Sequence, residues 1–148
     1  MTAEADLVVV GAGPGGFAAA LKARRMGLNV TLIEKYDMPG GVHTTGLQGS
    51  ANAGVGGIHT ELMAEFAAAG CIYTASEKTH PDWAGNPLSH YEKNLEPGSK
   101  FSRSSFDPEI AGRVMATMLD EAGVEVKYRT SLVEVVLDED GNSSTIDA

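Results

Sequence analysis

The feature that most constrains the fold is DLVVVGAGPGGFAAALKARRMGLNVTLIEK, residues 6–35, in which three glycines follow an apolar run at GxGxxG spacing. The β-branched run Leu7–Val10 suits a strand that is buried on both faces. The alanine-rich segment Pro14–Met26 suits a helix that packs close to a sheet, and Val30–Ile33 suits a second strand. This order predicts a βαβ unit over residues 5–35, which opens a Rossmann-like, doubly wound α/β fold with a parallel sheet.

Each glycine of this motif has a separate physical task. We expect Gly11 to make the tight turn out of the strand, Gly13 to let the backbone approach a pyrophosphate, and Gly16 to let the helix pack against the strand. The helix N-terminus would attract the diphosphate. Glu34 ends the second strand, 18 residues after Gly16, where a carboxylate accepts hydrogen bonds from the adenosine ribose and repels a 2′-phosphate. A chance glycine-rich turn is the alternative, but the order of the elements favours a site for an adenine dinucleotide other than NADP.

A second glycine-rich tract occupies residues 36–57. It contains seven glycines, with Thr44 and Thr45 among them. A simple NAD-binding domain continues to another helix and strand soon after its acidic residue. A long tract of glycine and threonine instead indicates a backbone that approaches an extended ligand along much of its length.

The chain here resembles the FAD-dependent oxidoreductases of the two-dinucleotide-binding-domain type. That family begins with a strand, GxGPxG, a helix, LIEK, Gly-Gly and a Thr/Gly segment, as this sequence does. The family's next helix is similar to GGIHTELMAEFAAAG. Its return to the FAD domain is similar to SFDPEIAGRVMATMLDEAGVEVKYRTSLVEVVLDEDG, whereas Ser76–Arg103 carries no resemblance. The resemblance implies FAD as cofactor, flavin-mediated hydride or electron transfer on a small-molecule substrate, and NAD(P)H or another electron partner.

The resemblance also implies a set of cofactor-binding residues. The fingerprint would hold the pyrophosphate, the end of the second strand the adenosine ribose, and the second tract the pyrophosphate and flavin. The residue opening the strand after YRT would meet adenine through its backbone, although its side chain fits an ordinary strand position equally well. In that order these residues are Gly11, Gly13, Pro14, Gly15 and Gly16; Glu34 with Lys35; Gly41, Thr44 and Thr45; and Val133.

The four histidines are the candidates for acid–base chemistry. His43 is the catalytic candidate, because it lies two residues after Gly-Gly, where the second tract should approach the flavin. His59 opens a predicted helix, where capping or packing explains it. His80 and His90 lie in a polar segment, where a solvated loop histidine is the more common finding. The sequence predicts no metal site.

The segment that starts at His43 allows an alternative. Its pattern His-Thr-x-x-x-Gln-Gly-x-x-Asn-Ala resembles the segment of succinate dehydrogenase and fumarate reductase flavoproteins in which histidine bonds covalently to FAD. Gly46, Leu47 and Ser50 depart from that pattern, as does the Gly-Gly before the histidine, so noncovalent FAD is preferred. A non-catalytic dinucleotide-binding regulatory module is a further alternative, which the second glycine tract disfavours.

The remaining sequence organises residues 1–148 as the N-terminal portion of an FAD-binding domain. After the glycine-rich loop 36–57 we expect a helix over Ile58–Ala69, a polar excursion over 76–105, and a returning helix and strands over 106–141. Asp107 is the expected cap of the returning helix, with Pro108 at its first position. Its apolar face is predicted at Ile110, Val114, Met118 and Ala122, followed by strands at Val124–Tyr128 and Leu132–Leu137.

Composition sets the remaining bounds. The 148 residues suffice for one domain, and the net charge of −9 argues against nucleic acid or an anionic membrane as partner. One cysteine permits no internal disulfide. The acidic start MTAEAD is unlike a signal peptide, and no apolar stretch is long enough to span a bilayer, so we expect a cytoplasmic protein. We also expect an incomplete sheet in a truncated portion of an enzyme, with only the start of a β-meander and an unpaired edge on its last strand, Leu132–Leu137.

Overall fold

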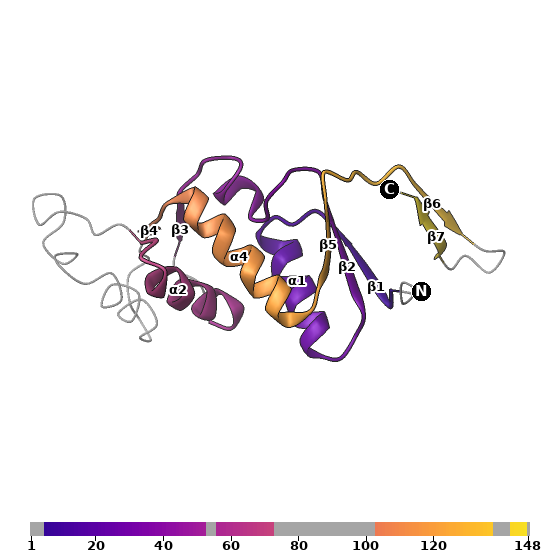
Figure 1. Cartoon of the computed structure of the whole chain (residues 1–148), viewed down its shortest axis with the longest axis horizontal. Coiled ribbons are helices and arrows are strands. Elements are labelled where there is room, and N and C mark those ends of the chain that lie inside the picture. Colours follow the sequence, from indigo (N-terminus) through magenta and orange to yellow (C-terminus); the bar gives the residue numbers. More distant parts are fainter. Residues whose placement is uncertain (1–4, 53–55, 73–102, 138–142, 148) are drawn as a thin grey trace, which may run out of the picture. The chain divides into compact units, whose positions relative to one another are not determined.

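The computed structural model describes residues 5–52, 56–72, 103–137 and 143–147 (Figure 1). The chain forms two compact units, one of residues 1–41 with 116–148 and one of residues 42–115. Its elements are β1 (Leu7–Val10), α1 (Pro14–Arg25), β2 (Val30–Glu34), η1 (Gly41–His43), β3 (Ser50–Asn52), α2 (Ile58–Ala68), β4 (Arg103–Ser105), α4 (Pro108–Ala122), β5 (Glu125–Tyr128), β6 (Glu134–Leu137) and β7 (Ser143–Asp147). The predictions for His80, His90 and most of the polar excursion lie outside the described residues.

The first unit is built on a parallel sheet with the strand order β1-β2-β5. Leu7 of β1 pairs with Val30 of β2, and Glu34 of β2 pairs with Tyr128 of β5. Every residue of β2 is buried. The predicted α/β fold with a Rossmann-like parallel sheet is therefore confirmed. The expectation that β1 is buried on both faces is wrong, because β1 lies at one edge of this three-stranded sheet and leaves Val10 53% exposed.

Helix α1 matches its prediction within one residue at its end. Phe17, Ala20, Leu21 and Ala23 are its buried residues, so small side chains alternate with large ones on the packed face. Gly27 follows the helix with a φ of +95°, a backbone conformation that favours glycine after a helix. The Arg24 side chain donates from Nε to the Gly123 carbonyl at 3.0 Å and from Nη1 to the Leu28 carbonyl at 3.2 Å.

The second unit holds two strands that the sequence did not predict. Within the tract expected to be a loop, β3 pairs antiparallel with β4, which comes from the end of the expected excursion. Gly49 precedes β3, and a Cβ there would lie 2.5 Å from the Phe106 carbonyl oxygen, so this pairing needs glycine. The Phe66 and Phe106 rings pack 5.0 Å apart. Buried Cys71 lies in this unit and donates from Sγ to the Asp107 carbonyl at 3.3 Å.

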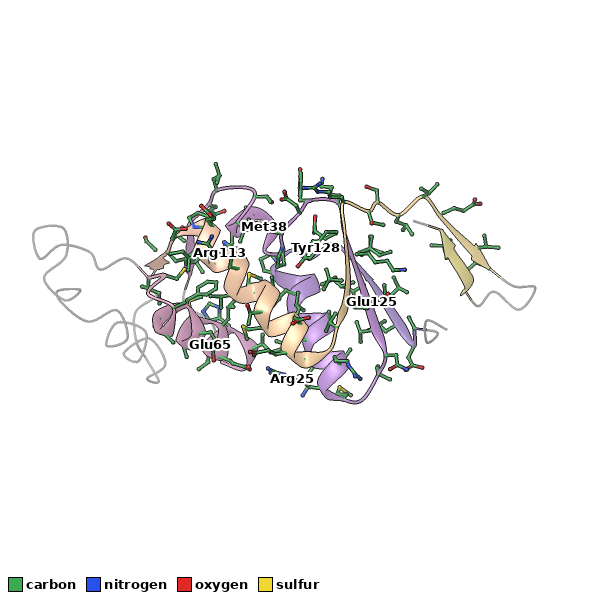
Figure 2. The ribbon with its side chains drawn as sticks, viewed as in Figure 1. Arg25, Met38, Glu65, Arg113, Glu125 and Tyr128 are labelled. Atoms are coloured by element: carbon green, nitrogen blue, oxygen red, sulfur yellow. The ribbon has the colours of Figure 1, made fainter. Side chains whose placement is uncertain are left out.

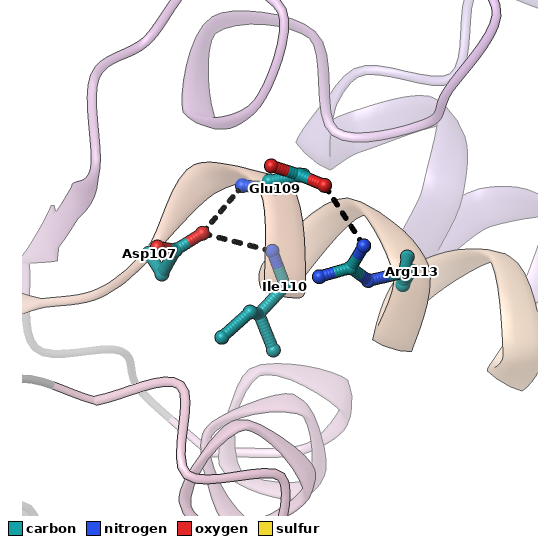
Figure 3. A network of polar contacts seen from close by, with 4 residues as sticks. All are labelled: Asp107, Glu109, Ile110 and Arg113. Carbon is teal, nitrogen blue, oxygen red and sulfur yellow. Dashed lines mark hydrogen bonds and ion pairs between the residues drawn. The ribbon is translucent and has the colours of Figure 1, made fainter.

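Helix α4 begins as predicted, with Pro108 at its first position after the Asp107 cap (Figure 3). The Asp107 carboxylate accepts hydrogen bonds from the Glu109 N–H at 2.9 Å and the Ile110 N–H at 3.0 Å. The predicted apolar face was wrong by about one position. Of its four residues only Met118 is buried, and the other buried side chains of α4 are Ala111, Met115 and Leu119. The apolar residues of this helix form two adjacent stripes. The stripe that contains Ala111, Met115 and Leu119 is buried, whereas Ile110 and Val114 of the predicted stripe are not.

The last two strands correct another expectation. β6 starts at Glu134, two residues later than predicted, and β7 pairs with it antiparallel, with Glu134 opposite Asp147 and Val135 opposite Ile146. The expectation that this strand lacks a partner is therefore wrong, because β7 supplies one. Among the described residues no helix combines the length and the apolar character needed to cross a membrane.

Candidate functional site: a glycine cradle at the ends of β1 and β2

The turn between β1 and α1 has the geometry that its glycines predict. Gly11 has a φ of +92° and donates its N–H to the Ile33 carbonyl at 2.7 Å. A Cβ on Gly16 would lie 1.8 Å from the Gly11 carbonyl oxygen, so glycine permits the close packing of helix on turn. A Cβ on Gly13 would meet nothing within 4 Å. The protein therefore leaves space in front of Gly13, where the sequence predicts a pyrophosphate.

Helix α1 presents free backbone donors to that space. Gly13 is its N-cap and offers no side-chain cap, while its carbonyl accepts the Phe17 N–H at 2.8 Å. Within the described part of the chain, no group accepts the N–H of Gly15 or of Gly16. Unpaired donors at the positive end of a helix dipole suit a diphosphate.

Gly40 and Gly41 lie against the turn between β1 and α1. Gly40 donates its N–H to the Ala12 carbonyl at 2.7 Å. Gly41 has a φ of +52°, and a Cβ on it would lie 3.0 Å from the Gly13 Cα. The structure thus brings Gly41 to the fingerprint turn, as expected for a residue near the pyrophosphate.

Glu34 is held at the end of β2 by two backbone donors. Its side chain is buried, with Oε2 accepting the Ala12 N–H at 2.7 Å and Oε1 accepting the Tyr36 N–H at 2.9 Å. Each carboxylate oxygen has a second lone pair, so the group can still accept the two ribose hydroxyls. The sequence indicated the carboxylate but not these two partners. Its contact with adenosine stays a prediction.

Sequence reasoning missed Tyr128, the register partner of Glu34 at the end of β5. Figure 2 labels this side chain. The turn that follows it is tied to β2, because Thr130 donates its N–H to the Glu34 carbonyl and Arg129 donates its N–H to the Tyr36 carbonyl, each at 3.0 Å. Burial raises the pKa of the Tyr128 phenol, and the nearby Glu34 charge raises it further.

The remaining cofactor candidates of the first unit stay predictions. Lys35 is exposed, with its ammonium 4.8 Å from the centroid of the Tyr36 ring. Val133 precedes β6 rather than opening it, and its side chain is 80% exposed. An exposed side chain at this position is compatible with the predicted backbone contact to adenine.

His43, Thr44 and Thr45 belong to the second unit. The His43 ring lies edge-on to Phe106, with centroids 5.9 Å apart, and its Nδ1 is 3.4 Å from the Gln48 carbonyl oxygen. Thr44 is buried. Burial lowers the pKa of His59, and the nearby His43 lowers it further. The two histidines therefore lie in one electrostatic environment, and their relation to a flavin stays a prediction.

Comparisons with known proteins agree with this geometry. The chain is 33% identical over 147 residues to digeranylgeranylglycerophospholipid reductase of Methanocella arvoryzae, a match that covers 93% of this chain and 33% of the relative. A dihydrolipoyl dehydrogenase of Manduca sexta is 55% identical over 40 residues, which cover 27% of this chain and 8% of the relative. The chain thus spans about a third of the length of the reductase.

Solved structures support the fold. The 3-ketosteroid-delta4-(5alpha)-dehydrogenase of Rhodococcus jostii matches with a TM-score of 0.56 and 19% identity, covering 98% of this chain and 42% of that chain. The family model described as FAD dependent oxidoreductase matches residues 6–148. The chain belongs to the FAD-dependent oxidoreductase family, whose cofactor is FAD.

Proposed function

We propose that this chain provides the FAD-binding part of an oxidoreductase that transfers hydride or electrons to or from a small molecule. The observation that carries the proposal is the open space in front of Gly13, next to unpaired N–H groups at the start of α1. Glu34 adds an acceptor for ribose hydroxyls in the same unit. A glycine turn without a ligand has no need for this combination.

Each residue of the site would hold a different part of the cofactor. Gly15 and Gly16 would bind the pyrophosphate through their backbone N–H groups, Gly13 would leave room for it, and Gly11 would make the turn in front of it. Glu34 would bind the adenosine ribose. FAD supplies the redox chemistry through its isoalloxazine ring, and the protein supplies position and electrostatics. Family membership favours this enzyme over the non-catalytic binding module.

The substrate is not assigned by this part of the chain. The Methanocella relative is by its name a reductase of a digeranylgeranylglycerophospholipid, but the match lies within a third of its length. That match supports the flavin more strongly than any substrate. A small-molecule substrate, an electron partner such as NAD(P)H, and a cytoplasmic location stay predictions.

The histidyl-FAD alternative gains no support from the relatives named above. His43 is the residue on which it depends, and the ring lies against Phe106 with Nδ1 near the Gln48 carbonyl. Noncovalent FAD remains the proposed form, with His43 as an acid–base candidate.

The test compares two valine variants of the purified full-length protein. Gly13→Val should abolish the yellow flavin absorbance, because its side chain would fill the space left for the pyrophosphate. Ala19→Val is the matched control, since Ala19 is exposed on the same helix and should keep the cofactor. Glu34→Ala should weaken FAD binding by about 1–3 kcal/mol, the usual cost of lost hydrogen bonds to a charged group. FAD bound at wild-type affinity by Gly13→Val would show that the fingerprint assignment is wrong.

A further inference from the structure

We propose that Tyr128 is a further nucleotide-binding residue, whose phenol donates a hydrogen bond to a ribose hydroxyl oxygen of the adenosine half. The inference rests on the proposed function, since it needs a nucleotide at Glu34. Tyr128 would add a hydrogen-bond donor to a ribose site for which only the Glu34 carboxylate, an acceptor, has been assigned.

The first step is the placement of Tyr128 on the sheet. Side chains alternate between the two faces along a strand, and register partners on neighbouring strands share a face. Thr31 and Glu125 demonstrate this, because the Thr31 hydroxyl donates to Glu125 Oε2 at 2.7 Å. Three residues further along, Glu34 and Tyr128 therefore share the opposite face, at the carboxyl ends of β2 and β5.

The second step is that Tyr128 is held while its hydroxyl is not used. The Thr130 hydroxyl donates to the Tyr128 carbonyl at 2.9 Å, and the Thr130 N–H donates to the Glu34 carbonyl. An ion pair between Arg129 Nη2 and Asp37 Oδ2, at 3.6 Å, joins the same two chain segments. Among the described residues, none accepts a hydrogen bond from the Tyr128 hydroxyl or donates one to it.

The third step is chemical complementarity. A ribose hydroxyl donates one proton and accepts through its oxygen, whereas an ionised carboxylate only accepts. Glu34 already takes two backbone N–H groups and keeps one lone pair on each oxygen for the ribose. The hydroxyl oxygen then needs a donor beside the carboxylate. The Tyr128 phenol supplies it, since a tyrosine phenol is protonated near neutral pH and can donate.

The experiment titrates the flavin-free form of the full-length protein with ADP and with 2′,3′-dideoxy-ADP, using calorimetry. Tyr128→Phe should bind ADP about threefold to tenfold more weakly than the wild type, the range expected for one hydrogen bond. With dideoxy-ADP, Tyr128→Phe and the wild type should bind equally. Tyr36→Phe is the control for loss of a phenol, because the Tyr36 ring is exposed and only its backbone contacts Glu34. This control should leave ADP binding unchanged.

Other outcomes overturn the inference. Equal affinity of Tyr128→Phe and the wild type for ADP would show that the phenol does not touch the nucleotide. Equal loss with both nucleotides would assign Tyr128 to adenine or to the structure of the site. A wild-type protein that binds neither nucleotide would instead contradict the proposed function.

Discussion

The packing of α1 on the β1 turn allows a sharp test, because two adjacent glycines of this helix should respond in opposite ways to alanine. A Cβ on Gly16 would lie 1.8 Å from the Gly11 carbonyl oxygen and must move 1.2 Å to reach the 3.0 Å limit of real contacts. The obstacle is backbone and cannot rotate away. Overpacking of this kind costs roughly 1–3 kcal/mol or more, against about 1 kcal/mol gained in helix propensity. A clash with backbone should cost about 3 kcal/mol, the upper end of that range. After the gain of about 1 kcal/mol in helix propensity, we expect Gly16→Ala to lower the free energy of unfolding by about 2 kcal/mol.

Gly15→Ala is the control, because a Cβ at Gly15 meets nothing within 4 Å. It should gain up to about 1 kcal/mol, since alanine restricts the unfolded chain more than glycine does. Urea unfolding of the flavin-free protein, followed by far-ultraviolet circular dichroism, measures both free energies. The reasoning fails if Gly16→Ala is as stable as Gly15→Ala.

Three further predictions concern the second unit. Because the pKa of His59 is lowered in the fold from 6.5, the unfolded chain binds protons more readily below that pH. The free energy of unfolding should therefore fall as the pH drops below 6.5, because protonation then favours the unfolded chain. In His59→Gln the urea midpoint should change less between pH 7.5 and 5.5 than it does in the wild type. Burial raises the pKa of the Cys71 thiol, so a thiol reagent at pH 7.5 should label the native protein much more slowly than the urea-unfolded protein; equal rates would contradict its burial. Acid precipitation of the holoprotein should release free FAD, whereas fluorescence that stays with the chain and disappears in His43→Ala would establish the covalent form.

The sequence predicted well those features that depend only on neighbouring residues, such as where a helix or strand begins and ends. Asp107 followed by Pro108 placed the start of α4, because a cap and a fixed φ act within a single turn of helix. The same holds for Gly27 after α1 and for Glu34 at the end of β2. Gly16 was assigned the correct task because its neighbours in sequence are also its neighbours in space.

Features that depend on distant partners were missed. β3 exists because it pairs with β4, about fifty residues later, and short polar strands carry no pattern of their own. Met115 and Leu119 of α4 are buried whereas the equally apolar Ile110 and Val114 are not, and the helical pattern alone does not distinguish these two pairs. Tyr128 became a candidate only through the register that sets it beside Glu34.

The pairing of β2 with β5 joins residues far apart in sequence, such as Thr31 and Glu125, which are 94 positions apart. Loop-closure entropy grows only with the logarithm of the span, and doubling it would cost only about 0.6 kcal/mol. The stability of the sheet therefore depends little on how many residues are inserted between β2 and β5. Inserts of very different size can be carried at this point, while β2 and β5 keep the same register.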